Sequence, residues 1–149
     1  MYTIEEYDKA KSKVLKYIIY KKRSKQEVRN KFYGTIEAEM LNDIIEELEE
    51  NGYIDDNNYI KRAINEFKAL KNLSLKEIRY KLMSKGISND LIEDYINFNE
   101  EEMEEYEINS AKNIIIKKQN LMEEEALIQY LVKKGYKTSN IRKAIELID

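Results

Sequence analysis

The sequence of 149 residues contains no cysteine, no histidine and no proline, and it has only four glycines. Without cysteine the chain can form neither disulfides nor thiolate nucleophiles, which fits a reducing compartment. Without histidine it lacks the commonest general base, and without both residues it lacks most kinds of zinc site. Proline costs about 3 kcal/mol and glycine about 1 kcal/mol inside a helix relative to alanine, so this composition permits helix almost everywhere.

Long hydrophobic runs are missing as well. No apolar stretch approaches the roughly 18 residues of a membrane-spanning helix, and the first residues do not resemble a signal peptide. We therefore expect a cytoplasmic protein with no membrane partner. A compact domain of this size buries about 70% of the surface that its unfolded chain exposes, so the chain can fold without disulfides or metals.

Recognisable catalytic and metal-binding motifs are absent from the sequence. The four glycines are spaced as helix ends and not as a phosphate-binding loop. The segment 55–58 with Glu66 superficially resembles a calcium loop, but Ile60 occupies the position at which such a loop needs glycine. We therefore expect no enzyme activity and no cofactor or metal.

What the sequence does contain is an internal repeat. The segment Ser24–Phe32 matches Ser74–Leu82 at a spacing of 50 residues, with serine, glutamate, arginine and lysine recurring at equivalent positions. A third copy follows 49 to 50 residues later, in which the positions of Ile78, Leu82 and Gly86 are taken by Leu127, Leu131 and Gly135. We expect an all-α fold of three tandem three-helix units, about nine helices in one elongated, curved array, with approximate units 3–53, 54–98 and 99–149.

Each unit shows the signals of three successive helices. In the second unit the first helix is predicted to begin at an N-cap, Asp55 or Asp56, and to carry an apolar stripe of Tyr59, Ile60, Ala63, Ile64, Phe67 and Leu70. Ser74 and Glu77 form a capping box for the second helix, as Ser24 and Glu27 do in the first unit. Gly86 ends that helix and Ser88 caps the third. We assign the aliphatic residues and tyrosines of these stripes to the core.

Charge alternates in phase with the repeat, although the net charge is only −3. The balance is +6 over 1–33, −9 over 34–60, +6 over 61–85, −9 over 86–107 and +3 over the remainder. If equivalent helices share a side of the array, one face is basic, and we predict that this face binds a partner. The candidate residues are Lys21, Lys22, Arg23, Lys25, Arg29, Lys71, Lys76, Arg79 and Lys81, with Lys31, Lys68 and Lys85 beside them. The alternative is that these charges are solvated, or that basic and acidic helices simply attract each other.

Several of these residues together resemble the RecX family of bacterial recombination regulators. The resemblance rests on Lys22-Arg23-Ser24-x-x-Glu27-Val28, Gly52-Tyr53-Ile54-Asp55-Asp56, Lys81-Leu82-x-x-Lys85-Gly86 and Tyr130-Leu131-x-x-Lys134-Gly135-Tyr136. It covers almost the whole chain, from about Ala10 onward. There is one departure, because relatives tend to carry glycine or proline where this chain has Leu70-Lys71-Asn72-Leu73.

The resemblance implies a partner and a mode of action. A RecX-like protein is an all-α array that binds the RecA filament on single-stranded DNA and restrains filament extension, ATP hydrolysis and strand exchange. It does no chemistry itself, and we expect a monomer with at most weak direct DNA binding. Two other interpretations stay open, a free-standing DNA-binding protein with helix-turn-helix-like units and a general protein-interaction scaffold.

Overall fold

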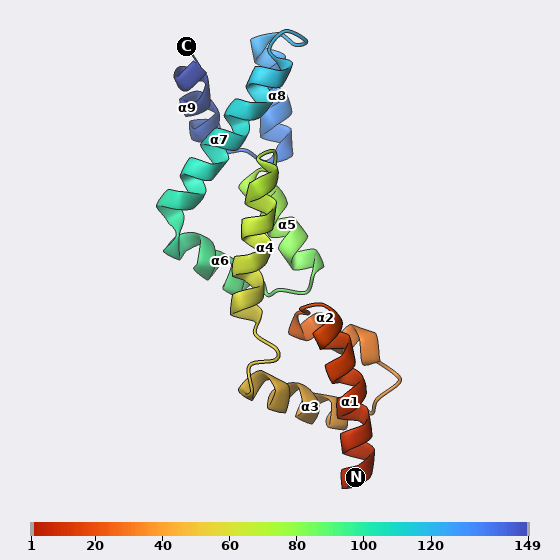
Figure 1. Ribbon diagram of the computed structural model, residues 1–149. Coiled ribbons are helices and arrows are strands. Elements are labelled where there is room, and N and C mark those ends of the chain that lie inside the picture. The colour runs from red at the N-terminus through yellow and green to blue at the C-terminus, as the bar shows by residue number, and fades with distance from the viewer. Residues whose placement is uncertain (1, 149) are drawn as a thin grey trace. The chain divides into compact units, whose positions relative to one another are not determined.

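The computed structural model describes residues 2–148, and the regular elements in that range are nine α-helices (Figure 1). In chain order they are α1 (Ile4–Tyr20), α2 (Lys25–Phe32), α3 (Ala38–Glu50), α4 (Asp56–Leu70), α5 (Leu75–Ser84), α6 (Asn89–Phe98), α7 (Glu100–Lys118), α8 (Glu124–Lys134) and α9 (Thr138–Ile148). The predicted all-α fold of repeated helix triplets is therefore confirmed.

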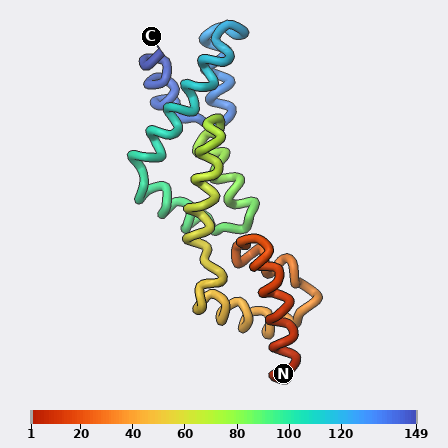
Figure 2. Tube along the Cα trace, viewed as in Figure 1, coloured from red at the N-terminus to blue at the C-terminus, as the bar shows by residue number. Residues whose placement is uncertain are grey.

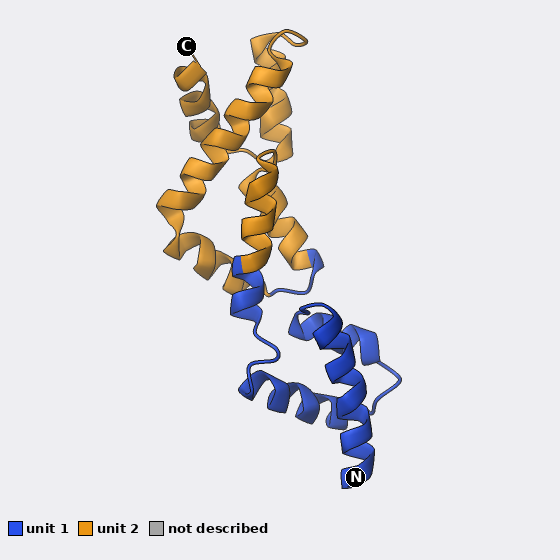
Figure 3. Ribbon diagram, in the orientation of Figure 1, with its two compact units in different colours: residues 1–61, 84–87 blue, residues 62–83, 88–149 orange. Residues whose placement is uncertain are grey.

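The contacts divide the chain into two compact units, drawn in different colours in Figure 3. One unit takes in residues up to Lys61 together with Ser84–Ile87. In it α1, α2 and α3 pack against one another (Figure 2) around buried Val14, Val28 and Ile44. The other unit takes in Arg62–Met83 and the residues from Ser88 onward. In it α7, α8 and α9 enclose a core that includes Ala111, Leu131 and Ile141.

Both predicted capping boxes are present. The Ser24 hydroxyl accepts from the Glu27 amide at 3.1 Å, and the Glu27 carboxylate accepts from the Ser24 amide at 3.0 Å. The corresponding distances between Ser74 and Glu77 are 3.0 Å and 2.9 Å. At α4 the cap is Asp55, whose carboxylate accepts from the Asn58 amide at 3.1 Å. The second alternative, Asp56, is the first residue of the helix.

The two capping serines also donate hydrogen bonds, and they do so to the following repeat. Ser24 Oγ donates to the carbonyl oxygen of Lys85 at 2.7 Å, and Ser74 Oγ donates to that of Lys134, also at 2.7 Å. Both serine side chains are buried. Each serine therefore caps the start of one middle helix and the end of the next, a pair of contacts that we call the serine junction.

A carboxylate completes each serine junction. The backbone amide of Lys25, at the start of α2, donates to Asp56 at 2.9 Å. The equivalent amide of Leu75, at the start of α5, donates to Glu107 at 2.7 Å. Both carboxylates come from the first helix of the following repeat. An acid beside a helix N-terminus satisfies a backbone donor and interacts favourably with the helix dipole.

The predicted apolar stripe on α4 is buried unevenly, and Tyr59, Ala63 and Phe67 are half-buried. Leu70 is 59% exposed, whereas Ile60 and Ile64 on the same helix are fully buried. The reason is that Leu70 is the last residue of α4, and the chain turns away at Lys71 with a positive φ of 55°. This turn lies in the segment where the sequence departs from the RecX pattern.

The positive φ of Lys71 leads to a prediction about stability. A residue with a Cβ in this conformation costs about 1–2 kcal/mol, a cost that glycine avoids. We expect Lys71→Gly to be about 1 kcal/mol more stable than Lys71→Ala in urea denaturation, because both variants lose the ammonium group and only glycine relieves the strain. The hydrogen bond from Asn113 to the Lys71 carbonyl, at 3.2 Å, is available to both variants. Equal stability would show that the turn is not strained.

Candidate partner-binding surface

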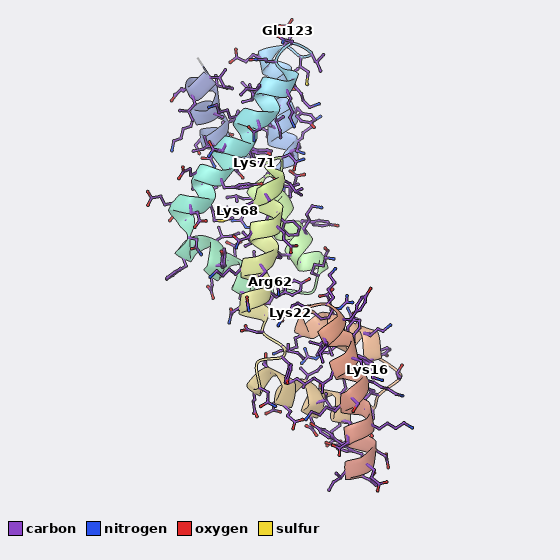
Figure 4. The ribbon with its side chains drawn as sticks, viewed as in Figure 1. Lys16, Lys22, Arg62, Lys68, Lys71 and Glu123 are labelled. Atoms are coloured by element: carbon purple, nitrogen blue, oxygen red, sulfur yellow. The ribbon has the colours of Figure 1, made fainter. Side chains whose placement is uncertain are left out.

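The nine candidate cations differ in how they are placed. Six are exposed and three are half-buried. The exposed ones are Lys21, Lys22, Arg29, Lys71, Lys76 and Lys81, and the half-buried ones are Arg23, Lys25 and Arg79. Figure 4 labels Lys22, which follows the end of α1, and Lys71, which follows the end of α4. The exposed group offers its charge to solvent and so to a partner.

Two of the half-buried cations form ion pairs with the acidic third helices. Lys25 lies 2.8 Å from the carboxylate of Glu49 on α3, and Arg79 lies 2.7 Å from that of Glu93 on α6. Part of the alternation of charge is thus attraction within the protein, as the alternative interpretation holds. Such pairs at the surface contribute little stability, about 0–1 kcal/mol each. Neither residue is a good candidate for holding a partner.

The acidic α3 makes a further pairing with α1. Glu47 accepts a hydrogen bond from the Tyr7 hydroxyl at 2.9 Å and lies 2.9 Å from the Lys11 ammonium. The hydrogen bonds from Lys11 and Tyr7 hold the pKa of the Glu47 carboxyl below its usual range. This carboxylate is therefore ionised at neutral pH and already has its partners within the protein.

An aromatic ring with a cation over it recurs in each repeat, between the ends of the first and middle helices. The recurring pairs are Tyr17 with Lys31 at 5.6 Å, Phe67 with Lys81 at 6.0 Å, and Tyr130 with Lys118 at 5.0 Å. In the third repeat the helices that supply the ring and the cation are exchanged. The sequence signal for this ring–cation pair is the recurrence of an aromatic residue, Tyr17 and Phe67, and of a lysine, Lys31 and Lys81, at a spacing of 50.

A second cation lies over the ring in the first and third repeats, Arg23 in the first and Lys134, 6.0 Å from the centre of Tyr130, in the third. The Arg23 guanidinium carbon lies 4.2 Å from the centre of the Tyr17 ring, which also contacts Phe32 edge-on at 5.7 Å. Arg23 Nε is buried and meets no hydrogen-bond acceptor within residues 2–148. Arg79 Nε is buried as well but lies 2.7 Å from the Glu93 carboxylate, so Arg23 is the half-buried candidate for which residues 2–148 supply no carboxylate.

A groove of about 660 Å³ lies beside α7 in the second unit. Its lining includes Lys68 and Lys71 from the end of α4, and Asn109, Lys112 and Ile116 from α7. Lys68, labelled with Lys71 in Figure 4, forms an ion pair with Glu102, which also lines the groove. The groove is thus of mixed charge, and Lys71 is the one candidate residue that it contains.

Two kinds of site are not found in the described part of the chain. Residues 2–148 contain no cluster of three or more acidic side chains placed to hold a metal ion. None of the helices in that range is both long and apolar enough to pass through a membrane. The geometry described above points to contacts with a charged partner.

The sequence and the fold are similar to those of proteins described as RecX. The regulatory protein RecX of Clostridium beijerinckii is 28% identical over 159 aligned positions, which include 97% of this chain and 72% of that protein. The regulatory protein RecX of Finegoldia magna is 29% identical over 144 positions, with 89% and 68% covered. The crystal structure of RecX from Lactobacillus salivarius has the same fold, with a TM-score of 0.82, 22% identity and 99% of both chains covered. No protein-family model matches the sequence.

Proposed function

We propose that this chain, whose resemblance to the RecX family is confirmed by these relatives and by their fold, regulates RecA by binding its filament on single-stranded DNA. The bound protein restrains extension of the filament, ATP hydrolysis and strand exchange. The observation that carries the proposal is the similarity to regulatory proteins named RecX over nearly the whole chain.

The distribution of exposed cations supports contacts by more than one repeat. Lys22 and Arg29 belong to the first repeat, and Lys76 belongs to the second. A filament presents the same phosphates and subunit surfaces again and again. A protein that makes two weak contacts on such a lattice gains avidity, because the second contact forms at a high effective concentration.

The proposal is tested by the RecA ATPase on single-stranded DNA, titrated with this protein at two salt concentrations. We expect ATP hydrolysis to fall at less than one copy of the protein per RecA monomer, because a few bound copies are enough to restrain a whole filament. Absence of any effect with a folded protein and a RecA from the same source would refute the proposal. Tight binding to duplex DNA without RecA would then favour the free-standing DNA-binding protein instead.

The contribution of the exposed cations is tested by a matched pair of triple variants. Changing Lys22, Arg29 and Lys76 to glutamine is expected to raise the half-inhibitory concentration about tenfold or more, because a loss of about 1.4 kcal/mol is a factor of ten. The control changes Lys133, Arg142 and Lys143, which are equally exposed and lie on α8 and α9, to glutamine. The control should shift inhibition by less than about twofold. Equal shifts would assign the effect to net charge alone.

A further inference from the structure

The first repeat departs from the other two at one position beside its aromatic ring. The residue directly before the capping serine is Arg23 in the first repeat and Leu73 in the second, and the third repeat has Met122 there. Leu73 is buried and Met122 packs against the core of its unit. Arg23 is therefore the charged residue among the three at this position. The second cation at the Tyr130 ring, Lys134, comes from a different position and is paired with Glu77 at 3.5 Å.

Arg23 gives the first repeat a cluster of positive charge around Tyr17. Arg23 and Lys31 both lie over the same ring, at 4.2 Å and 5.6 Å from its centre. Two like charges held close together repel each other, and a bound anion removes that repulsion. The ion pairs of the first unit are formed by Lys11 with Glu47 and by Lys25 with Glu49.

The ring holds Arg23 without consuming its hydrogen-bond donors. A guanidinium over an aromatic face keeps N–H groups at its own edge, and the terminal amino groups, unlike the buried Nε, can meet phosphate oxygens. Tyr17 itself is fixed, because it packs against the buried core of the first unit and against Phe32. Arg23 is therefore held at the ring, and Lys31, which is exposed, lies over the same ring.

Two exposed tyrosines lie at the ends of α1 and α2, the helices that supply Tyr17 and Lys31. Tyr20, one turn beyond Tyr17, ends α1 and is 86% exposed. Tyr33 follows Phe32 at the end of α2 and is 88% exposed. Exposed aromatic rings beside a basic surface are the means by which proteins bind single strands, since unpaired bases stack on them.

We propose that Tyr17, Arg23 and Lys31 form a binding site for the phosphodiester backbone of single-stranded DNA, with Tyr20 and Tyr33 available to stack on its bases. Arg23 and Lys31 contact phosphate oxygens, and Tyr17 is a positioning residue. The inference rests on the proposed function, in which the filament supplies the strand. It assigns the direct DNA contact to the first repeat.

The experiment measures binding of the full-length protein to a fluorescent oligothymidylate by anisotropy, without RecA, across a series of salt concentrations. The variant Arg23→Gln is expected to bind about tenfold more weakly. Its plot of log affinity against log salt should be shallower by about 0.7, the loss of one phosphate contact to a single strand. The control Arg62→Gln removes the same charge from an exposed position on α4 (Figure 4) and should change affinity by less than about twofold.

A second pair of variants tests the role of the ring. Tyr17→Phe keeps the ring, as Phe67 does in the second repeat, and should bind as the parent protein does. Tyr17→Leu should weaken binding while its far-UV circular dichroism stays that of a folded protein. Equal loss in Arg23→Gln and Arg62→Gln, or unchanged binding in Tyr17→Leu, would overturn the inference.

The RecA ATPase separates this inference from the proposed function. If the parent protein binds no oligothymidylate at low salt but inhibits RecA, and Arg23→Gln loses that inhibition, the cluster contacts an acidic protein surface and the DNA assignment is wrong. If Arg23 is needed for DNA binding but the parent protein leaves RecA hydrolysis unchanged, the site stands and the regulatory function fails.

Discussion

Replacing Glu107 with alanine is expected to lower the free energy of unfolding by about 3–5 kcal/mol. The Glu107 side chain is fully buried. Its carboxylate accepts from the Leu75 amide at 2.7 Å, and from the Lys137 amide and the Asn140 side chain at 2.9 Å each. The two amides stand at the starts of α5 and α9. Alanine would leave the Leu75 and Lys137 amides without this acceptor, and unsatisfied buried donors cost about 1–3 kcal/mol each. Asn140 Nδ2 also donates to Glu104, at 2.6 Å, and keeps that acceptor.

The prediction is checked by urea denaturation followed by far-UV circular dichroism. Glu105→Ala is the matched control, because Glu105 lies on the same helix but is exposed. We expect Glu105→Ala to change stability by no more than about 0.5 kcal/mol. Glu107→Gln keeps one acceptor oxygen but places an amide among donors, so its loss should fall between those of the two alanine variants. Similar denaturation midpoints for Glu107→Ala and Glu105→Ala would contradict the assigned role.

The second large effect is expected at Gly135, where two segments approach closely. This glycine has a φ of +103°, and a Cβ placed on it would lie 2.6 Å from Lys76 Cβ and 3.1 Å from Ser74 Oγ. Gly135→Ala therefore combines backbone strain with a clash at the serine junction. We expect a loss of about 2–4 kcal/mol, from strain of about 1–2 kcal/mol and overpacking of similar size.

Gly52 supplies the control for this prediction. It has a φ of +79°, and a Cβ there would meet nothing within 4 Å. Gly52→Ala should therefore show the strain alone, a loss of about 1–2 kcal/mol. Gly86→Ala should behave like Gly135→Ala, since its Cβ would lie 2.4 Å from Gln26 Cβ. If all three variants lost the same stability, close approach would contribute nothing at the serine junctions.

The sequence was sufficient to predict the helices because their signals are local. Ser74 and Glu77 are three residues apart, and the stripe around Ile60 and Ile64 has helical spacing, so both could be recognised without a structure. Glu107 could not be recognised in this way. It is one acid in a run of acids, and its burial depends on two amides about 30 residues away in either direction.

The sequence identified the basic residues of the candidate surface, but it did not show which of them are already paired within the protein. The sequence placed Lys25, Arg79 and Arg23 together among the candidates for the basic face. In the structure Lys25 and Arg79 are paired with carboxylates, whereas Arg23 lies on the Tyr17 ring. What separates these cations is the neighbour supplied by another helix, and the spacing of charges along the chain does not contain that information.

The serine junctions also bear on how repeat number can change in such a chain. Ser24 and Ser74 donate to equivalent lysine carbonyls, and Lys25 and Leu75 find equivalent acids. The donors at one junction therefore match the acceptors at the other. A genetic exchange that added or removed one whole repeat in register would leave every junction with a complete set of partners, so the same chemistry that joins the repeats allows the array to grow or shrink by unequal recombination.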